Sequence, residues 1–309
     1  MKHTSALVVI PPRAVWDAVQ EVRCVRDKSY LRWMPHVNLL YPFLEDDASG
    51  ETFADAAAIA ADALKDTSPF RCSLRAFAFF EHKRSATVWL HPSQCPGVDE
   101  ASESAKARRD VPEREARDDF ADGTSAKSLE PGSSVFPPVN QSVLSAQRAL
   151  ERAFPFANHL SAISSAGFTP HLSVGQWPDA VSASAAVANL RAGWRPVDFD
   201  VDAVFLISRP SDGSGPFRVR ARVPLGGGEP EVFETETETE TETETETGTE
   251  TETGTGAETK TPSAAEWFRE PYAPHAPPLG ARCLVPKRTR GRGARRARNK
   301  DAETETRET

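Results

Sequence analysis

The sequence has few of the residues that bind structural metals or form disulfide frameworks. It holds four cysteines in 309 residues, Cys24, Cys72, Cys95 and Cys283, and their spacing matches neither a metal-ligand set nor a disulfide pattern. We therefore interpret them as reduced thiols and expect an intracellular protein, cytoplasmic or nuclear. An HExxH motif, a CxxC pair and a paired acidic cluster are also missing, so the sequence predicts no metal and no cofactor.

Long apolar stretches are missing as well. No run approaches the roughly 20 apolar residues that a membrane-spanning helix needs. The run 6–10 ends at Pro11 and Pro12 and is too short for a signal peptide. We therefore expect neither a membrane-embedded nor a secretory segment.

Two stretches lack the apolar periodicity of a folded chain. Residues 97–138 are dense in Glu, Asp, Arg, Ser, Ala and Pro, and such a segment buries too little apolar surface to offset the entropy lost on ordering. Residues 229–309 hold a Glu-Thr repeat at 234–253 and then a basic segment at 282–300. We predict a disordered insertion in the first case and a disordered tail in the second.

The net charge of the chain is determined largely by its charged repeats. The formal net charge is −8, but much of the acidic excess lies in the Glu-Thr repeat, so it says little about the folded part. The basic segment 282–300 has two interpretations. It can contact nucleic acid or act as a nuclear-localisation signal, and a solvated polycationic tail fits the same composition.

The remaining chain, within 1–228, predicts one domain of roughly 170–200 residues. Periodicity and turn residues predict strands at 5–10, 70–80, 86–90, 201–207 and 217–223, and helices at 13–30, 51–65, 140–154 and 181–190. Each half holds a strand, a helix and a strand that begins with Pro-His, and we expect the insertion between the halves. Hairpins and interspersed helices favour an α+β fold with mostly antiparallel sheets, and we expect a monomer.

Two segments of the sequence echo one another around a histidine. Residues 33–42 read Trp-Met-Pro-His-Val-Asn-Leu-Leu-Tyr-Pro, and residues 168–178 read Phe-Thr-Pro-His-Leu-Ser-Val-Gly-Gln-Trp-Pro. Because side chains alternate between the faces of a strand, His36 shares a face with Asn38. His171 likewise shares a face with Ser173. The pattern predicts one cleft lined by two histidines.

Two imidazoles that face one cleft suit paired acid–base catalysis. Their unperturbed pKa of about 6.5 allows either role near neutral pH. One removes a proton from an attacking water or hydroxyl, and the other protonates the leaving oxygen. A phosphodiester fits because its nucleophile and its leaving group are both oxygens. The polar groups Asn38 and Ser173, about 6.6 Å further along each strand, are suited to donate hydrogen bonds to phosphate oxygens.

These motifs resemble those of the 2H phosphoesterases, which include RNA 2′,3′-cyclic phosphodiesterases and the 2′-5′ RNA ligase group. That family carries two His-x-Thr/Ser motifs, each on a strand. The segment His171-Leu172-Ser173 matches in full, whereas Asn38 stands where the first motif has Thr or Ser. The resemblance covers about residues 5–225, apart from the insertion.

The resemblance implies a bilobal α+β fold with two-fold pseudo-symmetry and a central cleft. It implies that His36 and His171 are the general acid and base, that Ser173 and Asn38 bind phosphate, and that no metal takes part. The implied substrate is RNA or a nucleotide with a 2′,3′-cyclic phosphate, or a related 2′-5′ or 3′-5′ linkage. Ligation would be the reverse reaction.

The departure at Asn38 keeps a second hypothesis open, a 2H fold that binds RNA or nucleotides without turnover. Other residues near the motifs also have two interpretations. Strand alternation places Trp177 on the face of His171, where it either stacks on a base or covers the edge of the core. His82 is expected at a polar hairpin tip, where it either meets a phosphate-rich substrate or lies in a solvated turn, and His91 has no motif context.

Overall fold

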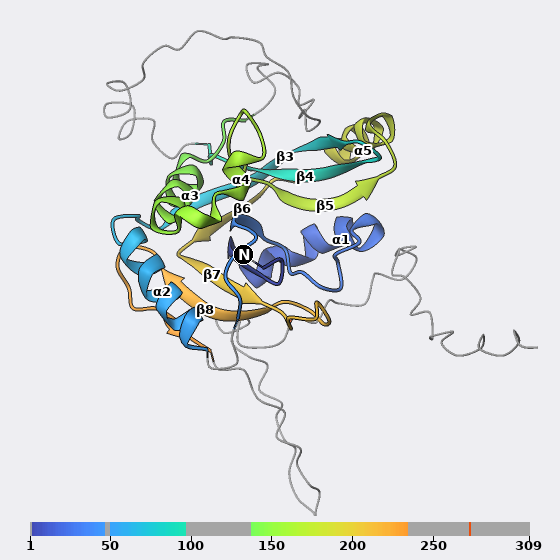
Figure 1. Ribbon diagram of the computed structural model, residues 1–309. Coiled ribbons are helices and arrows are strands. Elements are labelled where there is room, and N and C mark those ends of the chain that lie inside the picture. The colour runs from blue at the N-terminus through green and yellow to red at the C-terminus, as the bar shows by residue number, and fades with distance from the viewer. Residues whose placement is uncertain (1, 47–49, 97–136, 234–271, 273–309) are drawn as a thin grey trace, which may run out of the picture.

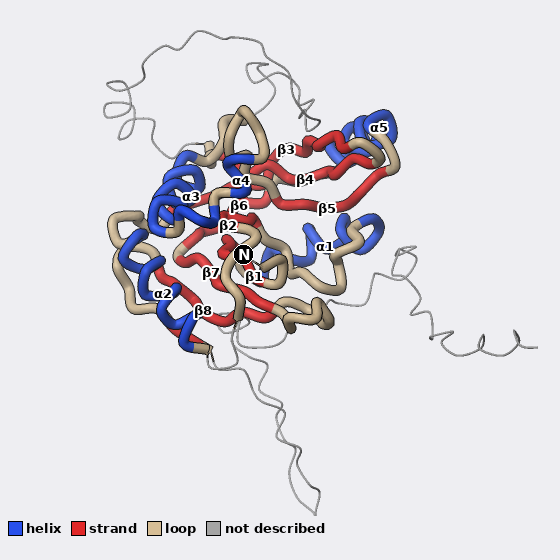
Figure 2. The backbone as a smooth tube through the Cα atoms, in the orientation of Figure 1, coloured by secondary structure: helices blue, strands red, loops and turns tan. Residues whose placement is uncertain are grey.

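The computed structural model describes residues 2–46, 50–96, 137–233 and 272 (Figure 1). Within these ranges the strands form two antiparallel sheets. Figure 2 shows the sheets as separate layers of strands with helices around them. The predicted insertion, except for its last two residues, and nearly all of the predicted tail lie outside the described residues.

The first sheet combines the beginning of the chain with its last described strands. Its strand order is β2-β1-β7-β8-β9. The bounds are Ser5–Val9 for β1, Val37–Leu40 for β2, Ala203–Ser208 for β7, Arg218–Pro224 for β8 and Glu231–Val232 for β9. β1 is buried on both faces, because Leu7 and Val9 enter the main core whereas Ala6 and Val8 enter a smaller one.

The second sheet comes from the middle of the chain and has the order β5-β4-β3-β6. Its bounds are Phe70–His82 for β3, Ser85–Ser93 for β4, Leu172–Trp177 for β5 and Val197–Val201 for β6. In both sheets the strand that follows a Pro-His motif lies at one edge, β2 in the first and β5 in the second. The two sheets therefore repeat one arrangement, and the fold is the expected bilobal, pseudo-symmetric α+β one.

Helices fill the space around and between the sheets. α1 (Trp16–Arg26) follows a 3-10 turn at Arg13–Val15 and packs against β5, and α2 (Glu51–Leu64) packs against β8 and α3. α3 (Gln141–Ala153) begins where the Asn140 side chain accepts hydrogen bonds from two backbone amides. The short α4 (His159–Ala162) follows a 3-10 turn at Pro155–Ala157, and α5 (Ala180–Gly193) covers the second sheet (Figure 1).

The predicted strand at 201–207 is wrong in one respect, because the structure divides this segment between the two sheets. β6 ends at Val201 and β7 begins at Ala203, so only Asp202 lies between them. The Asp202 carbonyl accepts from the backbone N–H of Leu225, and its carboxylate pairs with Arg222 at 3.0 Å. Both flanks are apolar and β-branched, so the pattern alone did not reveal the crossing.

The predicted position of the insertion, between the halves, is also wrong. β4 precedes the insertion and β5 follows it, yet β4 and β5 pair in the same sheet. The insertion therefore lies within the second lobe, and the first lobe is completed only by β7, β8 and β9. The sequence pattern is local, and it carries no information about which distant strands pair.

Part of the predicted tail packs on the domain. β9 pairs with β8 beyond residue 228, and Tyr272 is 6% exposed. The Tyr272 hydroxyl donates to the Tyr30 carbonyl at 2.6 Å and accepts from Gln20 Nε2 at 2.8 Å. Its ring meets the Trp16 ring edge-on. The folded unit thus includes residues beyond the boundary that we predicted.

Candidate active site

The two motif histidines lie at corresponding places in the two lobes. His36 directly precedes β2 and His171 directly precedes β5, and both side chains are partly exposed. The edge strands β2 and β5 lie next to each other across the lobe boundary. The histidines of the two lobes therefore belong to neighbouring edges, as the cleft prediction requires.

The two imidazoles are held by the same backbone interaction. His36 Nδ1 lies 2.7 Å from the Met34 carbonyl oxygen, and His171 Nδ1 lies 2.9 Å from the Thr169 carbonyl oxygen. A carbonyl oxygen only accepts, so Nδ1 carries the hydrogen in both rings. Each Nε2 is then left to accept a proton when the ring is neutral, or to donate one when it is charged.

A bulge follows each motif at the same position. On β2, Leu39 is the extra residue, because Val8 pairs with Asn38 and the adjacent Leu7 pairs with Leu40. On β5 the extra residue is Val174, because Trp89 pairs with Ser173 and Val88 pairs with Gly175. Each bulge comes three residues after its histidine. The internal symmetry therefore extends to the irregularities of the strands.

Burial lowers the pKa of both histidines. That of His36 falls to about 4, mainly through loss of hydration; the Met34 carbonyl opposes this shift and the Arg23 charge adds to it. The pKa of His171 is also lowered, first by burial, with His82 acting in the same direction. A charge on His171 lowers the pKa of His36 further. Both rings are thus neutral near pH 7 in the unliganded protein.

A buried polar network supports the His36 loop. The Trp33 ring stacks on His36, with centroids 4.4 Å apart and planes at 19°. The Trp33 carbonyl accepts a hydrogen bond from Arg23, which is 1% exposed. The same guanidinium bonds Asp27 and Gln20, and Gln20 in turn bonds Tyr272. One continuous set of contacts therefore connects Tyr272 with the first motif.

Aromatic rings of its own lobe surround His171. Phe80 of β3 meets it edge-on at 4.9 Å, and Trp89 of β4 lies 6.0 Å away between centroids. Trp89 also contacts His91, whose Nδ1 bonds Ser93 Oγ at 2.9 Å. The sheet face beneath His171 is therefore largely aromatic.

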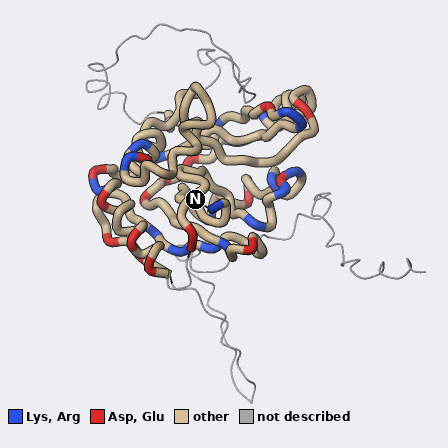
Figure 3. Tube along the Cα trace, viewed as in Figure 1, with Lys and Arg blue, Asp and Glu red and all other residues tan. Residues whose placement is uncertain are grey.

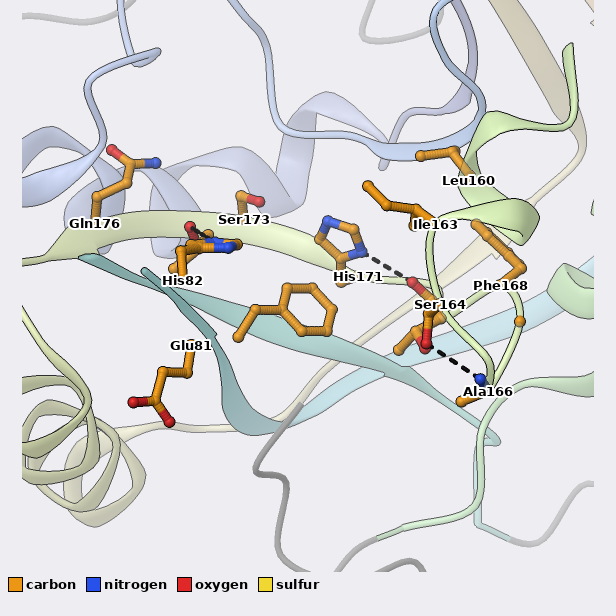
Figure 4. Close-up of a pocket in the computed structure, with 14 residues that line it drawn as sticks. Glu81, His82, Leu160, Ile163, Ser164, Ala166, Phe168, His171, Ser173 and Gln176 are labelled. Atoms are coloured by element: carbon orange, nitrogen blue, oxygen red, sulfur yellow. Dashed lines mark hydrogen bonds between the residues drawn. The ribbon is translucent and has the colours of Figure 1, made fainter. Parts of the chain in front are cut away.

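A pocket of about 380 Å³ opens beside His171 (Figure 4). His171 and Ser173 line its middle, Leu160, Ile163 and Phe168 lie at one end, and His82 and Gln176 lie at the other. Phe80, Glu81, Thr87, Ser164, Ala166, Gly167 and Thr169 complete the lining. The second predicted phosphate-binding residue, Ser173, thus faces an open space together with its histidine.

Asn38, the first predicted phosphate-binding residue, lies in a less favourable environment than Ser173. Asn38 is partly exposed on β2, two residues after His36, but its side-chain oxygen is buried and has no hydrogen-bond partner in the described part of the chain. The amide therefore brings an unsatisfied acceptor into the edge strand of the first lobe.

The sequence itself matches a family model. The model of the 2′-5′ RNA ligase superfamily matches residues 11–120 and again residues 118–213, together about two thirds of the chain. The chain belongs to the 2′-5′ RNA ligase superfamily, the 2H phosphoesterases. The members of this superfamily are generally phosphoesterases or ligases, so this 2H phosphoesterase belongs to an enzyme superfamily.

Other comparisons add little to the family assignment. No curated protein matches this 2H phosphoesterase. Among solved structures, the crystal structure of E. coli LigT complexed with 3′-AMP is similar at 14% sequence identity and a TM-score of 0.39. The similarity covers 73% of this chain and 99% of that chain.

The bulge on β5 changes which side chain accompanies His171. Strand alternation predicted that Trp177 shares its face, but the extra residue Val174 reverses the alternation beyond it. Gln176 lines the pocket instead, and Trp177 packs against the core. Of the two interpretations of Trp177, the structure supports core packing.

Sequence reasoning left the role of His82 open and assigned no role to His91 in this 2H phosphoesterase. His82 lines the pocket, and its Nε2 lies 3.0 Å from Thr87 Oγ1. His91 is buried, and burial lowers its pKa to about 4. Neither histidine lies in a motif. Only the register of β3 against β4 and β5 places them near His171, and pairing register is not visible in a single sequence.

Charged and metal-binding groups are sparse near the motif strands. β2 and β5 contain no Lys, Arg, Asp or Glu, and Figure 3 shows β5 without charged residues along its length. Within the described ranges, no group of three or more His, Cys, Asp and Glu could hold a metal ion. None of the described helices could span a membrane, and Cys24, Cys72 and Cys95 are free thiols.

Proposed function

We propose that this 2H phosphoesterase hydrolyses RNA or nucleotide 2′,3′-cyclic phosphates, with His36 and His171 as its general acid and base. The matched orientation of the two imidazoles carries the proposal. Each Nδ1–H is held by a backbone carbonyl, so each Nε2 is left for the substrate. Two such groups from neighbouring edge strands suit an in-line displacement, in which the entering and leaving oxygens lie on opposite sides of phosphorus.

In this proposal one neutral histidine accepts a proton from water as the water oxygen bonds to phosphorus. The bond from phosphorus to one ribose oxygen breaks, and the other histidine, protonated, donates its proton to that oxygen. The protonation states are restored through solvent. The free site lacks a protonated histidine, and the substrate anion would stabilise one. A nearby negative charge favours the imidazolium form and opposes the effect of burial.

Ser173 and Asn38 are proposed to bind the phosphate. A hydroxyl donor at Ser173 would stabilise the charge that develops on a non-bridging oxygen. The Asn38 amide can also donate. β2 and β5 carry no cation, so the donors that these two strands offer to the phosphate are neutral. The same groups would serve related 2′-5′ or 3′-5′ linkages, and ligation would be the reverse reaction.

Turnover of nucleoside 2′,3′-cyclic monophosphates, and of a short RNA with a cyclic phosphate end, tests this proposal. The assay runs in EDTA, and wild-type protein is compared with His36→Ala and His171→Ala. We expect turnover that survives EDTA and falls at least about 100-fold in each variant, since one proton transfer contributes about 10²–10⁴-fold. Full activity in either folded variant would contradict the paired mechanism.

The unsatisfied oxygen of Asn38 favours a second candidate, a 2H protein that binds nucleotides without turning them over. The substitution Asn38→Thr separates the two candidates, because it restores a hydroxyl at the first motif. A rise in turnover would indicate an enzyme with a weakened site. Tight nucleotide binding without turnover, in both wild-type protein and Asn38→Thr, would favour the binding protein.

A further inference from the structure

Tyr272 belongs to the core that adjoins the first motif. Its side chain is buried and packs in the smaller core cluster, together with Trp33 and Met34. Trp33 and Met34 lie just before His36 in the chain. Gln20, a hydrogen-bond partner of Tyr272, is 252 residues away in the sequence. A residue far beyond the last strand is therefore built into the surroundings of the first motif.

The hydrogen bonds between Tyr272 and the motif loop have determined directions. Arg23 only donates, so Gln20 Oε1 accepts from its Nη1 at 3.0 Å. Gln20 Nε2 then donates to the Tyr272 hydroxyl at 2.8 Å, and the hydroxyl donates to the Tyr30 carbonyl at 2.6 Å. Arg23 Nη2 donates to the Trp33 carbonyl at 2.8 Å. Tyr272 therefore restrains the loop at Tyr30 directly, and at Trp33 through two polar side chains of α1.

The orientation of the His36 ring depends on this loop. The Trp33 ring stacks on the imidazole with centroids 4.4 Å apart, and the Met34 carbonyl oxygen lies 2.7 Å from Nδ1. Together these two contacts determine where His36 Nε2 points. A movement of the loop therefore changes the direction of the group that transfers the proton.

His171 is supported in a different way. Its ring contacts Phe80 and Trp89 of its own sheet, and its Nδ1 lies 2.9 Å from the Thr169 carbonyl oxygen. Within the described ranges, none of these groups contacts Tyr272. The two histidines should therefore respond differently to a change at Tyr272.

We propose that Tyr272 is a positioning residue for His36, because its hydroxyl helps to fix the loop that orients the imidazole. The inference rests on the proposed function and goes beyond it, since turnover then depends on a residue outside both motifs. It also predicts an asymmetry. Loss of the Tyr272 hydroxyl should disturb His36 and leave His171 unchanged.

Histidine side-chain NMR tests the positioning without any substrate. Tyr272→Phe removes the hydroxyl and keeps the ring, and the two signals are assigned from His36→Ala and His171→Ala. We expect the His36 resonances to shift and the pKa of His36 to rise from about 4 toward the ordinary 6.5. The reason is that a loosened loop admits water to the buried ring.

Two features make this measurement specific to positioning. The charged and titratable groups that act on His36 are Arg23 and Asp27 of α1 and His171, and Tyr272→Phe alters none of them. His171 serves as the internal reference and should keep its resonances and its pKa. Unchanged His36 resonances, or equal shifts of both histidines, would overturn the inference.

Kinetics on a nucleoside 2′,3′-cyclic phosphate measures the consequence for turnover. Because a displacement of about 1 Å can cost about 100-fold, Tyr272→Phe should lower kcat by about 10- to 100-fold. KM should change little, since Tyr272 does not line the pocket beside His171.

Tyr41→Phe is the matched control for the kinetics. It also removes one hydroxyl, and the Tyr41 ring also meets the Trp33 ring, edge-on at 5.5 Å. Its hydroxyl donates to the His3 carbonyl, outside the contacts that join Tyr272 to the loop. The control should keep the wild-type kcat. An equal loss of kcat in both variants would overturn the inference.

Gln20→Met provides a second variant in case Tyr272→Phe does not fold. It interrupts the same contacts from α1 and leaves Tyr272 unaltered. The same shift of His36, without a shift of His171, is expected. Wild-type His36 resonances in folded Gln20→Met would overturn the inference.

The results also separate this inference from the proposed function. A shift of His36 alone, in a protein that turns over no cyclic phosphate, would support the positioning and contradict the phosphodiesterase. Turnover that requires His36 but is unaffected in Tyr272→Phe would contradict the positioning alone.

Discussion

At the scale of single residues, the histidines of the site are unusual because they are neutral before substrate arrives. In the proposed mechanism one of them is the general acid, which must carry a proton, and burial opposes this in the free protein. Substrate therefore has to supply the charge that stabilises the acid. The pH dependence of the reaction should report this difference between free and liganded protein.

We predict that the alkaline limb of kcat/KM lies at lower pH than the alkaline limb of kcat. The rate falls as pH rises through the pKa of the acid, and kcat/KM reports the free protein whereas kcat reports the complex. The pKa of His36 is about 4 in the free protein, and the phosphodiester anion raises the pKa of the acid in the complex. Profiles from pH 4 to 9 on a cyclic nucleotide test this, and coincident alkaline limbs would contradict it.

His91 should make stability depend on pH. Its folded pKa is about 4 because of burial, whereas the unfolded side chain titrates near 6.5. Between these values the unfolded state binds more protons, so the free energy of unfolding falls as pH drops from about 6.5 to 4. Urea midpoints at pH 7, 5.5 and 4.5 should show this fall, with a smaller slope in His91→Gln.

The exposed His159 provides the control for that measurement. His159→Gln should keep the slope of the wild-type protein. An unchanged slope in His91→Gln would mean that His91 is not the group responsible.

At the scale of elements, the end of α1 and the strand β5 meet at a glycine. A Cβ at Gly175 would lie 2.7 Å from Arg26 Cβ and 3.1 Å from the Arg26 carbonyl carbon. The next turn of chain donates the Lys28 N–H to Gln176. Close approach of the backbone at this point thus brings the first lobe against the strand that follows His171.

Gly175→Ala should therefore force α1 and β5 apart. We expect a loss of about 1–3 kcal/mol in the free energy of unfolding, the range for overpacking, together with reduced turnover, because β5 follows His171. Urea unfolding and initial rates measure the two effects. Gly193→Ala is the control, since nothing lies within 4 Å of its Cβ position, and it should be neutral or slightly stabilising. Equal effects at both glycines would refute this explanation.

Elements were predicted well from the sequence where their signal is local. α2, α3 and α5 follow apolar spacing, and β1, β3, β4 and β8 follow alternation or apolar runs, so their ranges fall within a few residues of those expected. His36, Asn38, His171 and Ser173 have local motifs, and the structure brings their strands together. The replacement of Trp177 by Gln176 depends on a bulge, which the register of a distant strand defines, and could not be predicted.

At the scale of the whole molecule, pairing between distant segments escaped prediction. β6 and β7 are contiguous in sequence but belong to different sheets, and β4 and β5 join across the insertion. Tyr272 enters a core that is otherwise built from residues before 220. Such contacts depend on the sum of the packing, which no window of sequence contains.

The burial of Tyr272 predicts a structural role for the tail. Tyr272→Phe removes the hydroxyl that accepts from Gln20 Nε2 and donates to the Tyr30 carbonyl, and the loss of a partner by a buried polar group such as Gln20 Nε2 costs about 1–3 kcal/mol. Deletion after residue 233 should lower stability at least as much, because it also removes the ring. Thermal and urea unfolding measure both changes. A deletion variant as stable as the full chain would contradict this structural role.

The single residue between β6 and β7 has a consequence for motion. A connection of one residue, Asp202, which is itself tied to Arg222 and Leu225, leaves no hinge at this crossing. The close contact of Arg26 with Gly175 restrains the lobes at a second point. The two lobes should therefore keep a fixed relative orientation and should not close over a ligand. Fluorescence energy transfer between labels on α2 and α5 should change little when nucleotide binds, and selection among ligands would then depend on which shapes the open cleft admits.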